Sequence, residues 1–513
     1  MTLVIGTFII LLLLGMPICF VLGISGAIFL MTTPDVSMLI APVKIAVATQ
    51  SFNFLAVPFF LIAGNVMSAA GITDRLITLA KTLTGHMIGG LAQVSVMLSA
   101  LMGGISGSAV ADASMESRAL GPSMLKEGYS KGFTAAILSY GGLITATIPP
   151  SAGLIMFGYV GNVSIGKLFV AGIVPGILMT VVLMTAVHIV SKKRGYVPTS
   201  PHRATVGEVL HSLKSSIWAA LFPVILVVTI RGGLFTTAEA GAFSVVYAIF
   251  VGIFFHRDLN FRNFMAVLDN SITDCGNILS IVTMAGVLGY TLTYSGIPTK
   301  MGEALISLSD NKYVLIFLIL LFLIFMGMVM DSAVNIIIFT PIFLPLLQQL
   351  GVNPIHFGVI MATVCTLGCM TPPVGTAMAA CCNILDCSIE EYTKESIPFV
   401  IAILLEFALL VFVPDISLWL PRLLYGIRIL LRFLSLYSLK ALPLRQGFWA
   451  FLGFAPKKRG SVCVSLNLPL ITRNLALTFP LRKRLLMASK TPSPISMTNM
   501  NCCSVYQTTC VLM

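Results

Sequence analysis

The sequence predicts an all-α polytopic membrane protein built from two inverted repeats, each with a re-entrant hairpin and a proline-broken transmembrane helix. Two observations support this fold class. The chain is 57% hydrophobic and 10% charged, whereas soluble domains carry about 25% charged residues. In addition, its apolar stretches contain glycine- and proline-rich interruptions that occur twice in the same order. The composition excludes a soluble protein, and the interruptions divide the chain into related halves.

The repeat rests on landmarks that share one offset along the chain. The segment Ser108–Val110 recurs as Ser332–Val334, and Pro149–Pro150 recurs as Pro372–Pro373. Three more landmarks repeat, with all offsets between 222 and 225 residues: Ala63–Gly64 with Ala285–Gly286, Gly71–Ile72 with Gly296–Ile297, and Gly121–Pro122 with Leu344–Pro345. Two membrane halves with corresponding interruptions are typical of secondary transporters, whose binding site lies between the halves.

The stretch Gly103–Asp112 is the first candidate for such a site. It places glycines, serines and one carboxylate inside a long apolar region. Non-helical backbone at membrane depth persists only where protein or a polar cavity surrounds it. Small residues also let transmembrane helices pack closely, but packing alone does not require Asp112 or serines on both sides of Gly107. We interpret the stretch as the tip of a hairpin.

The first part of the chain divides into a leading span and the first repeat. Residues 1–44 contain one span, Leu3 to Met31, which is too long for a signal peptide and should act as an uncleaved anchor. The first repeat covers residues 45–190. Its expected elements are a span at 45–70, an interfacial helix at 72–84, a hairpin at 86–125 with its tip at Ser106, a helix at 133–160 broken by two prolines that remove backbone donors, and a span at 167–190.

The second part repeats this order after a linking region. Residues 191–270 are expected to form a polar cytoplasmic connector at 191–215 and two linking spans at 217–230 and 239–255. The second repeat covers residues 271–426. Its expected elements are a span at 271–295, a polar stretch at 297–312, a hairpin at 313–350 with its tip near Asp331, a broken helix at 356–385 interrupted at 370–375, and a last span at 398–420.

Counting the crossings predicts that the two repeats are inverted. Five full crossings separate the span at residue 45 from its equivalent at residue 271, because a hairpin adds none. With the 191–215 connector inside, twelve Lys and Arg residues of the loops and helix ends lie on the cytoplasmic side and five outside, as the positive-inside rule expects. The first hairpin then enters from the cytoplasm and the second from outside, so that their tips meet near the midplane.

The chemistry that such a midplane site offers is the binding of a cation and an anion away from bulk water. Unwound helices expose carbonyl groups that coordinate Na⁺, and helix N-termini present N–H groups to a carboxylate. Behind the first tip, Asp112 and Glu116 lie one helical turn apart on one face, with Arg118 near. This trio is either a neutralised structural cluster or a functional one.

The formal charge of +12 belongs entirely to the last 87 residues. Residues 1–426 contain 19 basic and 19 acidic residues, whereas residues 427–513 hold 12 basic residues and no acidic one. A basic tail can bind anionic lipid or nucleic acid, but these charges are scattered without helical periodicity, so no nucleic-acid partner is expected. We interpret residues 427–513 as an out-of-frame or fused extension that does not fold with the rest. The 11 cysteines lack metal-ligand spacing and are interpreted as small packing residues.

Two other functions leave partial signatures in the sequence. Residues 161–168 nearly match a phosphate-binding loop, but Leu168 stands where Mg²⁺ needs Ser or Thr, so ATP binding is not expected. Asp112 and Asp331 could form the carboxylate pair of an intramembrane protease. Both lie beside glycine- and serine-rich tips within the duplicated architecture, which favours transport over proteolysis.

Five motifs, in order, resemble those of one known family. They are Gly104–Ser108, Ile148–Ser151, Ser164–Phe169, Pro354–Gly358 and Thr371–Gly375. Over residues 1 to 426 the chain is similar to the large membrane subunit of tripartite ATP-independent periplasmic (TRAP) transporters. The resemblance implies a multi-pass, elevator-type, Na⁺-driven carrier in the lipid bilayer of the bacterial inner membrane. It would take up a small organic acid such as a C4-dicarboxylate or a sugar acid, working with a small four-helix membrane subunit and a periplasmic substrate-binding protein, and it would not be an enzyme.

The resemblance also implies where two Na⁺ ions would bind. One would lie around the first tip and break, at Ser106, Gly107, Ser108, Thr147, Pro149 and Gly153. The second would lie at Asp331, Ser332, Asn335, Thr371, Pro372 and Gly375, with the organic anion between the two. Relatives in this family follow the first tip with small neutral residues, whereas this chain has Asp112. A single-component elevator-type carboxylate/Na⁺ symporter shares the same hairpins and broken helices and remains an alternative.

Overall fold

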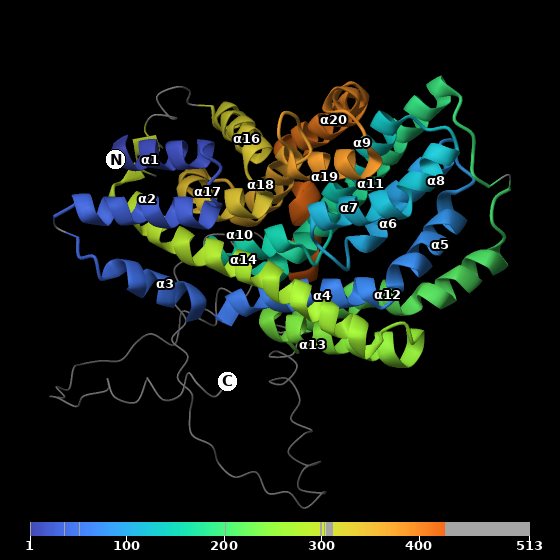
Figure 1. Ribbon diagram of the computed structural model, residues 1–513, viewed down its shortest axis with the longest axis horizontal. Coiled ribbons are helices and arrows are strands. Elements are labelled where there is room, and N and C mark those ends of the chain that lie inside the picture. The colour runs from blue at the N-terminus through green and yellow to red at the C-terminus, as the bar shows by residue number, and fades with distance from the viewer. Residues whose placement is uncertain are drawn as a thin grey trace, which may run out of the picture. The chain divides into compact units, whose positions relative to one another are not determined.

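The computed structural model describes residues 2–425, apart from Asp35, Ser51, Pro201, Pro298, Thr299, Gly302 and residues 304–310. Every regular element in these ranges is a helix, which confirms the all-α fold class (Figure 1). Seven described helices are long and apolar enough to cross a membrane, or up to nine if two bent pairs each count as one span. The predicted tail, residues 427–513, lies outside the described residues.

The prediction of a single leading span from Leu3 to Met31 is wrong in one respect, because the structure has two helices there. α1 (Thr2–Leu13) and α2 (Ile18–Thr32) are separated by a turn in which Gly15 has a φ of +73°. Pro17 follows this turn and has no N–H to continue the first helix. At about 1.5 Å per residue, the two helices reach only roughly 18 and 22 Å, and Figure 1 shows them lying alongside each other.

The span predicted at 45–70 is also divided. α3 (Ile40–Gln50) and α4 (Ala56–Ala69) are separated by the 3₁₀ turn η1 (Phe52–Leu55). α4 restarts just before Pro58, which is tolerated in the first turn of a helix, where no N–H partner is needed. After Gly71, α5 (Ile72–Thr84) turns by 72° and has the bounds expected for the interfacial helix.

In the first hairpin region, the helix is interrupted at the glycine-rich stretch, as predicted. α6 (Gly90–Met102) and α7 (Ala109–Ala119) are joined by residues 103–108, and α8 (Gly121–Lys126) follows. With 13 and 11 residues, α6 and α7 are roughly 20 and 17 Å long, too short to cross a hydrocarbon core of about 30 Å. The proline-broken helix comprises α9 (Lys131–Thr147) and α10 (Ala152–Val160), bent by 45°, and α11 (Ile165–Arg194) returns.

The linking region contains more helix than predicted. α11 continues to Arg194 and α12 (Val206–Gly232) begins within the expected connector, so residues 195–205 alone join the two helices. The reason is a capping box, in which Thr205 and Glu208 each bond the other's backbone N–H and start the helix early. α13 (Thr237–Phe250) and the π-helical turn η2 (Val251–His256) complete the region.

The second repeat keeps the predicted order of elements with shifted ends. Its first span begins ten residues earlier than expected, at Phe261, and a capping box at Ser388 likewise starts the last span early, before Pro414 interrupts it. Residues 415–425 are helical again. The elements are α14 (Phe261–Tyr294), α16 (Lys312–Val329), α17 (Ser332–Gln349), α18 (Pro354–Gly368), α19 (Thr376–Leu385) and α20 (Ile389–Phe412).

The core lies around α9, and both broken helices are packed tightly against their hairpins. α9 is buried from Gly132 to Thr147, with α6, α7, α11, α19 and α20 around it. A Cβ atom at Gly142 would lie 2.6 Å from the carbonyl oxygen of Ala109 in α7. In the second half, a Cβ atom at Gly368 of α18 would lie 2.4 Å from the Cα atom of Gly327 in α16. Each hairpin therefore contacts the broken helix of its own half backbone to backbone.

Candidate functional site

Both hairpin tips line one cavity of about 450 Å³, here called the tip cavity. Its wall is formed by residues 106–111, the start of α10, residues 331–334, and one face each of α4 and α14. The two tips are more than 220 residues apart in the sequence, as Ser108 and Ser332 show. The structure thus brings together the duplicated Ser-Ala-Val segments.

The first tip rests directly on the first break. Gly107 has a φ of +62°, and a Cβ atom there would lie 2.3 Å from the carbonyl oxygen of Pro150. The carbonyl oxygen of Gly107 accepts a hydrogen bond from the backbone N–H of Ala152 at 3.3 Å. Only glycine fits this position, because the backbone conformation and the close approach both exclude a side chain. The geometry of the first tip is therefore fixed by the break behind it.

The residues predicted around the first Na⁺ divide into two groups. Ser106, Gly107, Ser108 and Gly153 line the tip cavity. Thr147 is buried behind it at the end of α9, where its hydroxyl donates to the carbonyl oxygen of Leu143 at 2.8 Å, and Pro149 follows in the turn. The peptide bond between Pro149 and Pro150 is cis, as is the one between Pro372 and Pro373 in the second half.

The second tip presents a carboxylate and a hydroxyl to the same cavity. Asp331 and Ser332 line it, and Oδ1 of Asp331 accepts a hydrogen bond from the N–H of Ala333 at 2.9 Å. Asp331 is thus the N-cap of α17. The N-terminus of α7 also faces the cavity, but Ser108 makes no side-chain cap there. Of the two helix N-termini, that of α17 is capped by a side-chain carboxylate, whereas α7 has no side-chain cap but carries Asp112 in its first turn.

The other residues predicted around the second Na⁺ lie behind this tip. The Asn335 side chain is fully buried, and neither of its amide atoms has a hydrogen-bonding partner among the described residues. Its Nδ2 atom would lie 3.5 Å from a Cβ atom at Gly327. In the second break, the Thr371 hydroxyl donates to the carbonyl oxygen of Leu367, Pro372 follows, and the N–H of Gly375 donates to the carbonyl oxygen of Met328. A buried amide oxygen without a donor fits a role as a ligand for a hard cation.

Polar residues of the cavity on α4 and α14 were missed by the sequence analysis. Asn65 of α4 donates from Nδ2 to the Ser271 hydroxyl at 3.1 Å and to Oδ2 of Asp274 at 3.3 Å. Asp274 and Asn277 of α14 line the cavity with it. The available signal was helical spacing, because Asn270, Asp274 and Asn277 recur every three or four residues and so share one face of the helix.

Asp112 and Glu116 lie buried on α7 beside the first tip. The Ser99 hydroxyl donates to Oε1 of Glu116 at 2.8 Å. One oxygen of each carboxylate has no partner among the residues that the structure describes. Arg118 is exposed and forms no ion pair with another described residue. The arginine therefore does not neutralise the two carboxylates as the structural interpretation required.

A larger cavity of about 880 Å³, here called the vestibule, adjoins the tip cavity at one end. Asn65, Ala111, Ser114 and Asp274 line both of them. The vestibule extends to Asp74 and Arg118, at the end predicted to be cytoplasmic. A third cavity of about 400 Å³ near Lys44, at the end predicted to be outside, shares no lining residue with the tip cavity. The tip cavity thus shares lining residues with the cavity that reaches the predicted cytoplasmic end, and shares none with the cavity near Lys44.

Comparisons with known proteins agree with the motifs. Residues 5–416 match the family described as "Tripartite ATP-independent periplasmic transporter, DctM component". The chain is 34% identical to the sialic acid TRAP transporter large permease protein SiaM of Vibrio cholerae, over 81% of this chain and 97% of that protein. It is 33% identical to the 2,3-diketo-L-gulonate TRAP transporter large permease protein YiaN of Escherichia coli, over 79% and 94% of the two chains.

A solved structure shares the fold at low sequence identity. The YdaH transporter of Alcanivorax borkumensis aligns with a TM-score of 0.56 and 14% identity, over 81% of this chain and 99% of that one. At this identity the likeness concerns the arrangement of helices alone.

Proposed function

Because the chain belongs to the DctM component family of tripartite ATP-independent periplasmic transporters, we propose that it takes up a small organic anion with Na⁺ as the coupling ion. The chain is a multi-pass inner-membrane permease and not an enzyme, since its relatives are large permease subunits. This family assignment argues against the alternative that Asp112 and Asp331 form the carboxylate pair of an intramembrane protease. Delivery of the anion by a periplasmic binding protein, and assembly with a small four-helix membrane subunit, belong to the same proposal.

The observation that carries the proposal is the joint lining of the tip cavity by both hairpin tips. Hydroxyl, carboxylate and backbone oxygens of the tips are ligands that a hard cation prefers. The N-terminus of α17 is already capped by the Asp331 carboxylate, so we place a cation beside this tip. The N-terminus of α7 has no side-chain cap, although Asp112 lies in its first turn, and the dipole of this helix favours a negative group at that end. We therefore place the carboxylate of the substrate at α7.

The substrate class follows from the size of the cavity and from the relatives. A volume of about 450 Å³ lies in the range of small-molecule sites, roughly 300 to 1,000 Å³. The names of SiaM and YiaN give sialic acid and 2,3-diketo-L-gulonate as the compounds that those systems carry, and both are sugar acids. We propose a sugar acid or a similar small carboxylate, including C4-dicarboxylates, for this chain.

The test is uptake into proteoliposomes that contain the chain with its small membrane subunit. A radiolabelled organic acid and the binding protein are supplied outside, and a Na⁺ gradient, ATP or neither is imposed. Uptake is expected only when the Na⁺ gradient and the binding protein are both present. Uptake without the binding protein supports the single-component symporter instead, and uptake with ATP alone contradicts the proposal.

Removal of residues 427–513 is expected to leave this uptake unchanged. Every described residue that lines the tip cavity or the vestibule precedes position 425, and the family match ends at residue 416. Truncation after Tyr425 retains the contact between the Lys167 ammonium and the Tyr425 ring. The measurement is uptake by equal amounts of truncated and full-length protein. A stably expressed truncated chain without uptake would show that the basic tail has a role in transport.

A further inference from the structure

The wall of the tip cavity that comes from α4 and α14 carries polar side chains that belong to neither hairpin tip. Asn65, Asp274 and Asn277 line the cavity there. Asn65 and Asp274 also line the vestibule, so they lie where the two cavities adjoin. Ala111 of α7 lines both cavities with them. A substrate whose carboxylate lies at α7 would therefore place the rest of the molecule against this wall.

This wall offers hydrogen-bond acceptors to a ligand. Both hydrogens on Nδ2 of Asn65 are used, one toward the Ser271 hydroxyl at 3.1 Å and the other toward Oδ2 of Asp274 at 3.3 Å. Oδ1 of Asn65 therefore remains as an acceptor. The Asp274 carboxylate can only accept, and among the described residues it accepts from Asn65 alone and forms no ion pair. Both side chains can thus accept further hydrogen bonds from a ligand.

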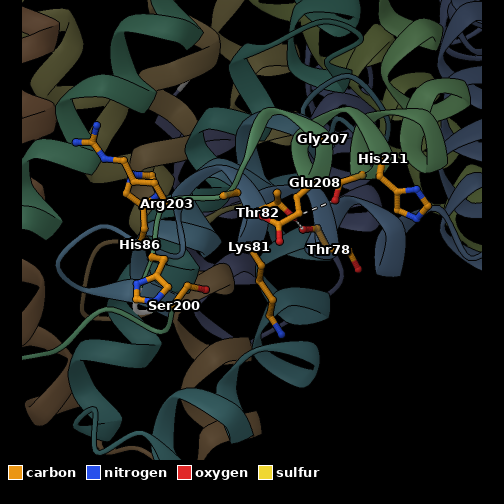
Figure 2. Close-up of a pocket in the computed structure, with 12 residues that line it drawn as sticks. Thr78, Lys81, Thr82, His86, Ser200, Arg203, Gly207, Glu208 and His211 are labelled. Carbon is orange, nitrogen blue, oxygen red and sulfur yellow. Dashed lines mark hydrogen bonds between the residues drawn. The ribbon is translucent and has the colours of Figure 1, made fainter.

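The charge of the tip cavity is negative along its described lining. Its charged side chains are Asp274 and Asp331, and no Lys, Arg or His lines it in the part of the chain that the structure describes. The basic side chains Lys81 and Arg203 instead lie around a separate pocket between α5 and the start of α12 (Figure 2), which shares no lining residue with the tip cavity. A ligand group beside Asp274 is therefore favoured if it donates hydrogen bonds and disfavoured if it is negative.

We propose that Asp274 and Asn65 select a polyhydroxylated monocarboxylate, whose hydroxyl groups donate to these two side chains, and reject an acid with a second carboxylate at its far end. This inference rests on the proposed function and narrows its substrate class to sugar acids with one carboxylate. A second carboxylate would place an acceptor against an acceptor and a negative charge against Asp274. A site built to bind a substrate hydroxyl rejects analogues that lack it, because its own polar groups are then left unpaired.

The test is isothermal titration of the full-length chain with its small membrane subunit, in detergent and saturating Na⁺, without the binding protein. The probes are D-gluconate and D-glucarate, which differ only at carbon 6, where the first has a hydroxymethyl group and the second a carboxylate. The unmodified chain is expected to bind D-gluconate more tightly by about three-fold to a hundred-fold. This is the range for two like charges roughly 6 Å apart as the dielectric constant falls from about 80 to about 20.

Asp274→Asn keeps the size of the side chain and removes its charge. This variant is expected to bind D-gluconate about ten-fold more weakly, because a hydrogen bond to a charged acceptor becomes one to a neutral acceptor. It is expected to bind D-glucarate more tightly than the unmodified chain does, so that the preference between the two acids is lost. The matched control is Asp74→Asn, which removes the same charge from the vestibule but not from the tip cavity and should leave the preference unchanged.

The outcomes separate this inference from the proposed function. Equal affinity of the unmodified chain for the two acids, or a preference that Asp274→Asn leaves intact, would overturn the inference, whereas Na⁺-dependent binding of either acid would still support the proposed function. A higher Na⁺ requirement in Asp274→Asn with an unchanged preference would assign Asp274 to a cation instead. Binding of neither acid, with or without Na⁺, would count against both.

Discussion

Replacement of Gly107 by alanine is expected to reduce Na⁺-driven uptake by roughly 100-fold, the scale of loss that a displacement of about 1 Å can cause at a functional site. The new Cβ atom would lie 2.3 Å from the carbonyl oxygen of Pro150, more than 1 Å inside an ordinary contact. The left-handed conformation of the residue adds about 1–2 kcal/mol for any residue with a side chain. The first tip must therefore move away from the break. The measurement is the initial rate of uptake per molecule in proteoliposomes.

The control separates the backbone conformation from the collision. Gly128, in the turn before α9, has a φ of +89° and no atom within 4 Å of its would-be Cβ position. Gly128→Ala carries the same conformational cost without a clash and is expected to keep uptake within about two-fold of the unmodified chain, since 1–2 kcal/mol acts on overall stability alone. Comparable losses in the two variants would mean that the contact with Pro150 has no particular role.

Replacement of Asn335 is expected to raise the Na⁺ concentration needed for half-maximal uptake, which a change in packing alone does not do. Asn335→Ala removes one oxygen ligand, worth roughly 1 to 3 kcal/mol, and should raise the Na⁺ concentration for half-maximal uptake by about five-fold to a hundred-fold. Alanine at Ser106, Ser108, Ser332 or Thr371 should raise it in the same way. Asn335→Leu fills the same space without a polar group, so in Na⁺-free buffer it should unfold at a higher temperature than the unmodified chain.

Asn335→Leu is expected to raise the unfolding temperature because the amide of Asn335 has no hydrogen-bonding partner among the described residues. A buried polar group without a partner is destabilising, and Na⁺ relieves that penalty only when it is bound. Added Na⁺ should raise the unfolding temperature of the unmodified chain and not that of Asn335→Leu. Ser25→Ala is the control, because the Ser25 hydroxyl is buried on α2 and has no partner in the described structure. Unchanged Na⁺ dependence in both Ser108→Ala and Ser332→Ala would reduce the repeated Ser-Ala-Val segment to a packing motif.

Most of the element order could be predicted from the sequence, because glycine and proline act locally. The interruptions at Gly103–Ser108, at Pro149–Pro150 and near Asp331 fall where helices end in the structure. The errors also have local causes. Gly15 and Pro17 end a helix inside an apolar run that hydropathy alone reads as continuous, and the Thr205 and Ser388 capping boxes start helices inside segments that looked polar.

The cavity itself was less accessible to sequence reasoning, since it depends on contacts between distant segments. The repeat placed Ser108 and Ser332 at equivalent positions, and the structure puts both in one wall. Nothing local links Asn65 with Asp274, however, because their side chains meet only after α4 and α14 have packed together. Asp112 shows the same limit. Its charge and helical position could be read from the sequence, but the outward placement of Arg118 could not.

The shared lining of the tip cavity and the vestibule bears on how the proposed binding protein outside the cell would drive transport. Four residues line both cavities, and the vestibule reaches the end predicted to be cytoplasmic, whereas the proposed binding protein would act from the opposite face. A partner with equal affinity for both conformations does not change their relative populations, however tightly it binds. Moving the ratio from 1:99 to 99:1 takes a difference in affinity of about 10⁴. On the proposed function, the loaded binding protein would have to bind one conformation more tightly than the other, and part of its binding free energy would be used in selecting that state.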